Sequence, residues 1–364
     1  MKYTIDKISA ADAKFEAQKI AFAPLAFQAV RALLELGILR KVSDAGDSGL
    51  TRREAADLTG VSAYGAGTLL EMALALRVVR LRPDSSPDTE ERFVLGKIGW
   101  FLLEDDMGRV NLNFVNDVCY QGAGLLAESV KTGKPEGLSL FGTQWKTIYE
   151  ALPSLPEKAR KSWFEFDHFY SDRAFPEALP IVFARKPRKL FDIGGNTAKW
   201  AIRCCAYDPD VEVTIIDLPA QTAAAEQNAA AAGFGNRIKI YPCNALDPEA
   251  VFPAGADAVW MSQFLDCFSL EEVTGILTKI KSAVGDETDV FVLEPLWDMQ
   301  RFEASAYSLL ATSLYFTCMA NGNSKMYRFK ELAEAVESAG FELKTAHHEV
   351  GSNGYSLLRF RKKP

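Results

Sequence analysis

The chain has 364 residues, of which 48% are hydrophobic, and a net charge of -7. This length is sufficient for two packed domains, and no low-complexity tract predicts extended disorder. The acidic balance and the absence of a long basic run argue against nucleic acid as the main partner, because an acidic surface repels phosphate backbones.

Two further features indicate the compartment. The N-terminal residues 1–7 have no apolar core followed by a small-residue cleavage site, and no apolar run in the chain reaches membrane-spanning length. None of the six cysteines forms a C-x-x-C pair, so reduced and mostly buried thiols are expected, with no metal site. We therefore expect a cytoplasmic protein without a membrane partner.

The chain begins with helical patterns. Apolar residues at helical spacing predict an amphipathic helix over 22–36, which ends near Gly37. Thr51 and Glu54 are spaced as a capping box, in which each side chain satisfies a backbone N–H of the other residue. A second helix is therefore expected to start directly after Thr51.

A helix over 63–76 and a hairpin come next. The runs 78–82 and 92–95 predict two short strands, joined by a polar turn at 83–91. Helix, turn, helix and hairpin make a winged helix, a module that reads DNA in other proteins. Because residues 63–72 contain no Lys or Arg that could meet phosphates, DNA binding is not expected here.

The middle of the chain, residues 109–170, is predicted to be helical and is rich in aromatic residues. Most such residues pack in cores, and only a few can line a pocket. The aromatic side chains of this segment include Phe114, Tyr120, Trp145, Tyr149, Trp163, Phe164 and Phe166.

From residue 186 onward, strand patterns alternate with helix patterns. This alternation predicts an α/β fold with a doubly wound sheet that binds its ligand at the carboxyl ends of the strands. Strands are expected at 189–193, 212–217, 238–241, 258–261, 290–293, 343–349 and 355–361, with helices at 219–232, 270–284 and 329–339.

The first two of these strands carry the most informative motif. The strand at 189–193 ends in Gly194 and Gly195, which allow a sharp turn and a close approach of backbone to ligand. The next strand ends in Asp217, where a carboxylate can accept both hydroxyls of a ribose. The pattern G-x-G-x-x-G of dinucleotide sites is not met, so the turn suits a cofactor without a pyrophosphate; a turn without any ligand is the alternative.

Four segments resemble, in order and spacing, the small-molecule O-methyltransferases related to plant phenolic and hydroxyindole methyltransferases. They are 192–195 (Asp-Ile-Gly-Gly), 217–219 (Asp-Leu-Pro), 256–261 and 292–295 (Val-Leu-Glu-Pro). The resemblance covers nearly the whole chain. It implies a Rossmann-like doubly wound methyltransferase sheet, an α-helical winged-helix dimerisation domain and a homodimer. The implied boundaries are 1–105 for dimerisation, 106–185 for a helical linker and pocket wall, and 186–364 for the catalytic domain.

The resemblance also implies S-adenosylmethionine as cofactor and a set of residues around it. Gly194 and Gly195 would face the methionine part, Asp217 the ribose and Leu218 the adenine. Asn244 stands where relatives have Asp, and its carbonyl can still accept from an adenine amino group. The full predicted shell comprises Asp192, Gly194, Gly195, Asp217, Leu218, Asn244, Ala245, Ser262, Tyr170 and Ser171.

The catalytic segment departs from the family pattern of leucine, histidine, aspartate and tryptophan. Asp266 occupies the position of the histidine that takes the phenol proton. Glu294 is retained at the end of its strand, whereas the second orienting glutamate is replaced by Ser324. Asp266 and Glu294 are therefore the candidate catalytic residues.

Three interpretations of this segment remain open. Asp266 is the base, which requires burial to raise its pKa towards neutrality. Alternatively, alignment of the reactants is sufficient and no base is needed. In the third, the fold binds cofactor or ligand without methyl transfer. Asp266 could also simply cap the helix that begins near Ser269.

The resemblance implies a substrate that is a hydroxylated aromatic or polyketide-like small molecule of secondary metabolism, methylated on oxygen or on an activated ring carbon. Aromatic residues available for stacking are Trp163, Phe264, Tyr315 and Phe316. The competing functions are a retired methyltransferase that only binds a ligand, a transcription factor, and an NAD-dependent oxidoreductase. Tighter binding of NAD than of S-adenosylhomocysteine would favour the last of these.

Overall fold

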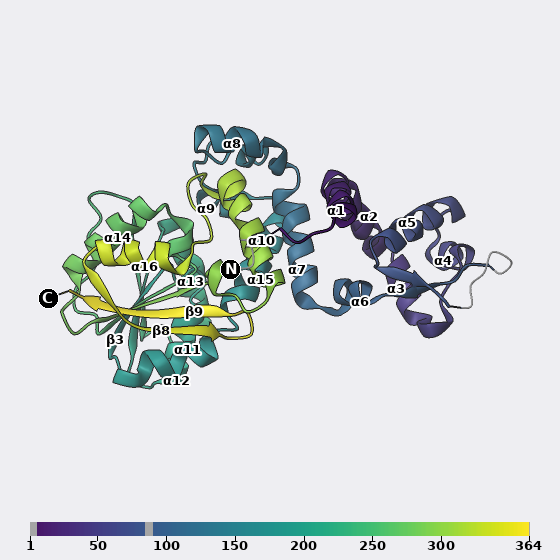
Figure 1. Ribbon diagram of the computed structural model, residues 1–364. Coiled ribbons are helices and arrows are strands. Elements are labelled where there is room, and N and C mark those ends of the chain that lie inside the picture. Colours follow the sequence, from purple (N-terminus) through teal and green to yellow (C-terminus); the bar gives the residue numbers. More distant parts are fainter. Residues whose placement is uncertain (1–5, 84–89, 364) are drawn as a thin grey trace. The chain divides into compact units, whose positions relative to one another are not determined.

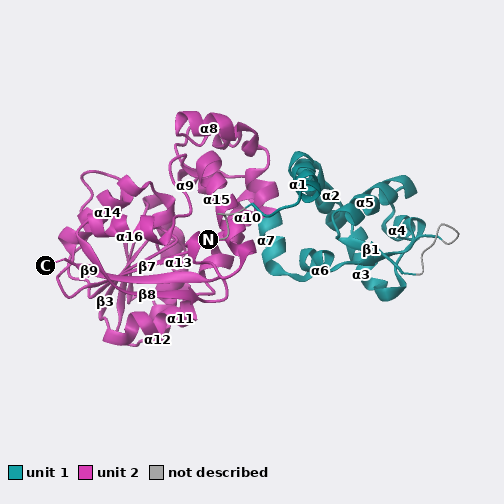
Figure 2. Ribbon diagram, viewed as in Figure 1, with its two compact units in different colours: residues 1–112 teal, residues 113–364 magenta. Residues whose placement is uncertain are grey.

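The computed structural model describes residues 6–83 and 90–363. Its contacts divide the chain into two compact units, Met1–Leu112 and Asn113–Pro364, coloured separately in Figure 2. The predicted division into three parts at 105/106 and 185/186 is finer than this and stays a prediction. Within the described ranges, no helix is both long and apolar enough to cross a membrane.

The first unit consists of helices followed by a two-stranded antiparallel sheet. The capping box of Thr51 and Glu54 is confirmed at the start of α4, and β1 pairs with β2 as a hairpin would. Most of the predicted turn between them, at 84–89, lies outside the described residues. The elements are α1 (Ala10–Ala21), α2 (Ala23–Glu35), α3 (Ile38–Asp44), α4 (Arg52–Thr59), α5 (Ala63–Ala75), β1 (Val79–Leu81), β2 (Phe93–Leu95), α6 (Lys97–Glu104) and α7 (Asp106–Phe114).

The second unit is built on a seven-stranded sheet with the order β5-β4-β3-β6-β7-β9-β8. The first five strands in this order are parallel to one another, and β9 runs antiparallel to both β7 and β8, so the sheet is mixed. All seven predicted strands are confirmed to within two residues at each end. They are β3 (Lys189–Ile193), β4 (Glu212–Asp217), β5 (Ile238–Pro242), β6 (Ala258–Ser262), β7 (Asp289–Glu294), β8 (Phe341–Val350) and β9 (Tyr355–Lys362).

Alternate residues of the central strands build two cores, one on each face of the sheet. Leu190, Ile215 and Trp260 pack on one face against α11 (Phe175–Val182), α12 (Lys199–Tyr207) and α13 (Pro219–Ala231). The neighbouring residues in the sequence, among them Phe191, Ile216 and Val259, pack on the other face against α14 (Leu270–Ala283) and α16 (Phe329–Ser338). Figure 1 shows α12 and α14 on opposite sides of the strands.

A third core lies in the helical part of this unit. It joins segments that are distant in the sequence, because residues of 114–163 pack against residues of 309–326. Trp163 donates its Nε1–H to the Tyr315 hydroxyl across 2.7 Å, which ties the two segments together. The helices are α8 (Leu126–Thr132), α9 (Ile148–Ala151), α10 (Glu157–Ser171) and α15 (Glu303–Tyr315), and the last continues as a π-helical turn, Phe316–Ala320.

Candidate functional site

A cavity of about 940 Å³ lies in the second unit, between the sheet and the helical core. Its walls include the carboxyl ends of β3, β4 and β6, together with side chains from α9, α10 and the turn after α15. Ligands of doubly wound sheets bind at this end, where the strand order reverses, here between β3 and β6. The volume is near the upper end of the range of about 300–1,000 Å³ typical of small-molecule sites.

Most of the predicted site residues meet in this cavity. Tyr170 and Glu294 are the exceptions, since neither lines it. The predicted residues that do are Asp192, Gly194, Gly195, Asp217, Leu218, Asn244, Ala245, Ser262, Ser171 and Asp266, and the aromatic residues Trp163, Phe264, Tyr315 and Phe316 line it as well.

The turn after β3 is tight because both of its glycines have close neighbours. A Cβ at Gly194, whose φ is +75°, would lie 2.5 Å from the Phe264 ring, and one at Gly195 would lie 2.8 Å from Asp192 Oδ2. Asn196 and Ala198 continue this turn, and both have left-handed backbones, with φ of +48° and +68°. The turn thus keeps its glycine-like shape although two of its residues are not glycine.

The turn also holds the acid at the end of β4. Asp217 accepts hydrogen bonds from the backbone N–H groups of Asn196 at 2.8 Å and of Leu218 at 2.7 Å. These bonds fix the carboxylate at the cavity wall, and each oxygen retains a lone pair for a ligand. Asn244, at the adjoining wall, uses its side-chain oxygen to accept from the Leu246 N–H.

Unsatisfied polar atoms gather in this cavity. Among the described residues, nine buried side-chain polar atoms have no hydrogen-bond partner, and six of these belong to residues that line the cavity. Since buried polar groups in proteins are nearly always paired, this concentration indicates a ligand that supplies the partners. The six atoms are Tyr149 Oη, Asp192 Oδ2, Trp200 Nε1, Trp260 Nε1, Ser262 Oγ and Gln263 Oε1.

The cavity is also rich in buried acids. Burial raises the pKa of Asp192 to about 8, with a further contribution from the charge of Asp217. Burial likewise raises the pKa of Asp217, against the two backbone hydrogen bonds that lower it. No Lys or Arg is among the groups that act on either carboxyl. Such a site favours a positively charged ligand, which would supply the missing counter-charge.

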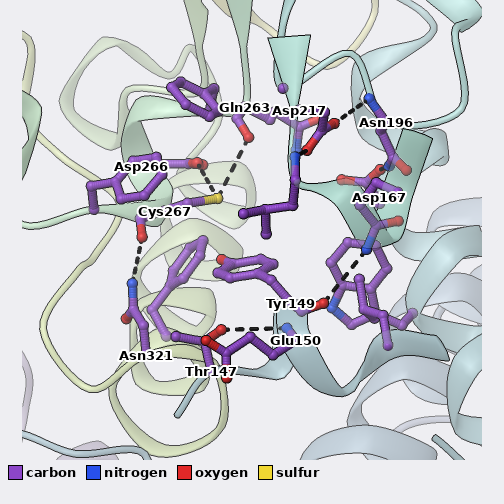
Figure 3. A pocket seen from close by; sticks show the side chains of 18 of the residues that line it. Thr147, Tyr149, Glu150, Asp167, Asn196, Asp217, Gln263, Asp266, Cys267 and Asn321 are labelled. Atoms are coloured by element: carbon purple, nitrogen blue, oxygen red, sulfur yellow. Dashed lines mark hydrogen bonds between the residues drawn. The ribbon is translucent and has the colours of Figure 1, made fainter. Parts of the chain in front are cut away.

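Asp266 lies in a short turn, Leu265–Cys267, directly after β6. Its side chain is buried, and burial raises its pKa to about 7. The Cys267 thiol donates to Asp266 Oδ1 at 3.4 Å and holds this carboxyl in place (Figure 3). The interpretation of Asp266 as a helix cap is wrong, because Ser269 caps α14 and forms a capping box with Glu272.

Glu294 lies behind this turn. Its Oε1 accepts the backbone N–H groups of Phe264 at 3.0 Å and Leu265 at 2.8 Å, so the glutamate shapes the segment that carries Asp266. Burial and the neighbouring charge of Asp266 raise the pKa of Glu294. Glu294 does not line the cavity, and its contacts with the Phe264 and Leu265 backbone place it behind the turn that carries Asp266.

Tyr170 lies outside the cavity. Its neighbour Ser171, at the end of α10, lines the cavity wall, whereas Tyr170 does not. Tyr170 packs against Phe166 and Phe169 instead.

The lining residues that no motif predicted include Asp167, Tyr149, Gln263 and Cys267. Figure 3 shows Asp266 and Cys267 opposite Asp217 and Asn196, with Tyr149 on a further wall. The oxygen of Asp167 accepts from Asn196 Nδ2 at 3.1 Å, and burial raises the pKa of this acid too. Gln263 has a left-handed φ of +47°, an unusual backbone conformation that no sequence pattern revealed.

Comparison with solved structures assigns the fold. The chain matches the apo S-adenosylmethionine-dependent methyltransferase SibL with a TM-score of 0.70 and 23% identity, covering 95% of this chain and 98% of the other. It matches the O-methyltransferase NcsB1, solved with S-adenosylmethionine and 2-hydroxy-5-methyl naphthoic acid, with a TM-score of 0.62 and 21% identity over 92% and 95% of the chains. The fold is that of a class I methyltransferase.

Sequence comparison gives the family. The model of an O-methyltransferase domain matches residues 126–342, and that of a Dimerisation2-like domain matches residues 14–86. The chain therefore belongs to the O-methyltransferase domain family, and it is an S-adenosylmethionine-dependent methyltransferase.

Two characterised relatives are similar over most of their length. The L-tyrosine C(3)-methyltransferase of Streptomyces lavendulae is 24% identical over 330 residues, which cover 90% of this chain and 86% of the relative. The demethylspheroidene O-methyltransferase of Cereibacter sphaeroides is 25% identical over 318 residues, covering 86% and 78%. The family thus includes methyl transfer both to carbon and to oxygen.

Proposed function

We propose that this enzyme methylates a phenolic small molecule, on its hydroxyl oxygen or on the ring carbon beside it, and that Asp266 is the base that accepts the phenol proton. The observation that carries this proposal is the placement of a buried carboxyl, with a pKa raised to about 7, in a cavity walled by aromatic side chains. A base works best when its pKa lies near the working pH.

The residues around the turn after β3 fit the cofactor. The cationic methionine end of S-adenosylmethionine would meet Asp192, whose Oδ2 is buried without a partner. The ribose hydroxyls would donate to Asp217, and Leu218, Asn244 and Ala245 would contact the adenine. Ser171 and Ser262 complete the proposed shell. When bound, the cofactor supplies a methyl group on a positively charged sulfur.

The chain's own residues then prepare the acceptor. Asp266 removes the proton from the acceptor hydroxyl, which makes the oxygen, and by resonance the neighbouring ring carbon, more nucleophilic. Cys267 and Glu294 keep the carboxyl in position through their hydrogen bonds to Asp266 and to its segment. Exclusion of water in a buried site strengthens each of these electrostatic effects.

The aromatic wall supports a flat acceptor. Trp163, Tyr315 and Phe316 line the cavity on the side of the helical core. Aromatic side chains favour offset or edge-to-face contacts with a ring. The names of the characterised relatives agree with this chemistry, since one of them methylates the ring of L-tyrosine and another, from Streptomyces sahachiroi, methylates 3-hydroxy-5-methyl-1-naphthoate on oxygen.

The first unit fits a homodimer. The Dimerisation2-like match lies entirely within it, and Ile20, Phe22 and Leu25 are large apolar side chains that it exposes. Apolar groups that gather on a surface favour association with a partner. A dimer formed through the winged-helix region 1–105 would be seen by light scattering and lost on deletion of that region. A cytoplasmic location stays a prediction from the sequence.

Titration calorimetry with S-adenosylmethionine and S-adenosylhomocysteine is the direct test, with the Asp217→Ala variant beside the wild type. The variant loses hydrogen bonds between a charged group and the ribose, each worth about 1.5–3 kcal/mol, so a Kd roughly 100-fold weaker is expected. Wild-type binding followed by turnover of simple phenols would support the proposal. Binding without turnover of any phenol would favour a retired enzyme.

A further inference from the structure

We infer that Tyr149 is a second functional group of the acceptor site: its hydroxyl donates a hydrogen bond to the oxygen from which Asp266 removes the proton. The inference rests on the proposed function and narrows its substrate class. An acceptor held in this way carries a hydroxyl that ionises, so phenols are selected over anilines and other nitrogen acceptors.

The position of Tyr149 in the cavity carries the inference. Its hydroxyl oxygen is buried in the cavity wall and makes no hydrogen bond of good geometry with the described residues, and the Cys267 thiol lies near enough for a weak one only. A buried hydroxyl in this state lacks the partners that such groups normally have. Tyr315, by contrast, lines the same cavity with its hydroxyl occupied by the Trp163 Nε1–H.

The backbone of Tyr149 is fixed from two sides. Thr147 caps the short helix α9 through a 3.4 Å bond from the Glu150 N–H to Thr147 Oγ1. The side chain of Gln221, from α13 on the sheet, donates to the Tyr149 carbonyl at 3.5 Å. The ring also meets Trp163 edge to face, with 6.4 Å between centroids. The hydroxyl is therefore held in place before any acceptor arrives, as an electrostatic donor should be.

The surroundings keep this hydroxyl protonated. Burial raises the pKa of Tyr149 well above its usual value, and the Cys267 thiol and the Asp266 carboxyl raise it further. In the proposed mechanism Asp266 takes the acceptor proton and Cys267 holds the Asp266 carboxyl in position. Tyr149 is thus a neutral donor close to Asp266, and it remains a donor across the range in which Asp266 loses its proton.

In the proposed reaction, the acceptor O–H bond breaks and its proton moves to Asp266. The Tyr149 O–H bond stays intact and donates to the resulting phenolate. Transfer to oxygen forms an O–CH3 bond as the S–CH3 bond breaks. Transfer to the adjacent carbon forms a C–CH3 bond instead, and the ring proton is then released to water. In both cases Tyr149 stabilises negative charge on the acceptor oxygen.

The test uses the full chain with S-adenosylhomocysteine bound and 4-nitrophenol as the acceptor probe, because its phenolate has its own absorbance. Tyr149→Phe is compared with the wild type and with Tyr355→Phe. Tyr355 is a suitable control because its hydroxyl is also buried without a partner but does not line the cavity. The measured quantity is the apparent pKa of the bound probe.

Loss of a hydrogen bond to a charged oxygen, worth about 1.5–3 kcal/mol, should raise the apparent pKa of bound 4-nitrophenol by roughly one to two units in Tyr149→Phe and leave it unchanged in Tyr355→Phe. An unchanged value in Tyr149→Phe would overturn the inference, as would equal shifts in both variants. Absence of probe binding to the wild type with S-adenosylhomocysteine bound would overturn it together with the proposed function. Probe binding and the expected shift without methyl transfer would remove the proposed function alone.

Discussion

Strand β7 carries a buried acid at each end, and the two acids have opposite surroundings. Asp289, at its start, meets Arg361 at 2.7 Å, Arg185 at 3.2 Å and Arg359 at 3.9 Å. Glu294, at its other end, forms no ion pair with a cation of the described residues and lies against Asp266. Burial raises the pKa of both acids, and the charge of Asp266 raises that of Glu294 further. One end of the strand is neutralised and the other is not.

The difference separates a structural acid from functional ones. The Asp289 carboxylate already has arginine partners and has nothing further to bind. Buried acids without cations destabilise the empty protein, and such groups persist where a ligand or a reaction uses them. The acids at the cavity end of the sheet therefore lower the stability of the empty protein and serve ligand binding and the reaction, whereas Asp289 at the opposite end stabilises the fold.

The largest effect is expected for Asp266→Asn. An amide cannot take a proton from the acceptor, so kcat should fall by about 10²- to 10⁴-fold while the Kd for S-adenosylhomocysteine stays the same. In the wild type, kcat should rise with pH through about 7, since the carboxyl must be ionised to act as a base. Full activity of the variant would show that alignment alone drives the transfer.

The second-largest effect is expected for Asp289→Asn, which should change the stability of the protein and not its rate. The amide keeps the shape but weakens the charged hydrogen bonds to the arginines, so the free energy of unfolding should fall by about 2 kcal/mol. Urea unfolding measures this, with kcat as the control that should not change. A loss of kcat at unchanged stability would mean that the two ends of β7 are not separate in role.

The smallest effect is in the pH dependence of stability. Because the folded-state pKa of Asp266 is raised from about 4 to about 7, the folded protein binds more protons than the unfolded chain in this range. Its contribution to stability therefore decreases as pH rises, by about 1 kcal/mol between pH 6 and pH 8.

Asp266→Asn should flatten this slope, because an amide does not titrate, and Asp289→Asn should leave it as in the wild type. Urea unfolding of the cofactor-free protein at both pH values gives the comparison. Equal slopes in all three proteins would contradict the assignment of a raised pKa to Asp266.

Much of the fold follows from periodicity and turn residues. The parallel strands were found because each is a short apolar run between helix patterns, as at 189–193 and 212–217, and the structure confirms them. The antiparallel pairing of β9 with β7 was not predicted, since the neighbour of a strand depends on pairing and not on composition. Asp266 was one candidate for the cap of α14 because Asp, like Ser, is a favoured capping residue, and only the hydrogen bonds between Ser269 and Glu272 decide between them.

The site was predictable where it lies at strand ends and much less so where helices form its wall. Asp192 and Asp217 lie at the carboxyl ends of β3 and β4, which are neighbours in the sheet, so the topology alone brings them together. Tyr149 and Asp167 come from helices whose rotation about their own axes is set by packing, which local sequence does not specify.

The Cys267 thiol beside Asp266 has a chemical consequence of its own. A thiolate is a far better methyl acceptor than a phenol, so an ionised Cys267 would itself take the methyl group and the enzyme would be inactivated. Burial, and then the negative charge of Asp266, raise the pKa of Cys267 well above its usual value. Asp266, which activates the acceptor, thereby also helps to keep the Cys267 thiol protonated and so protects it from methylation.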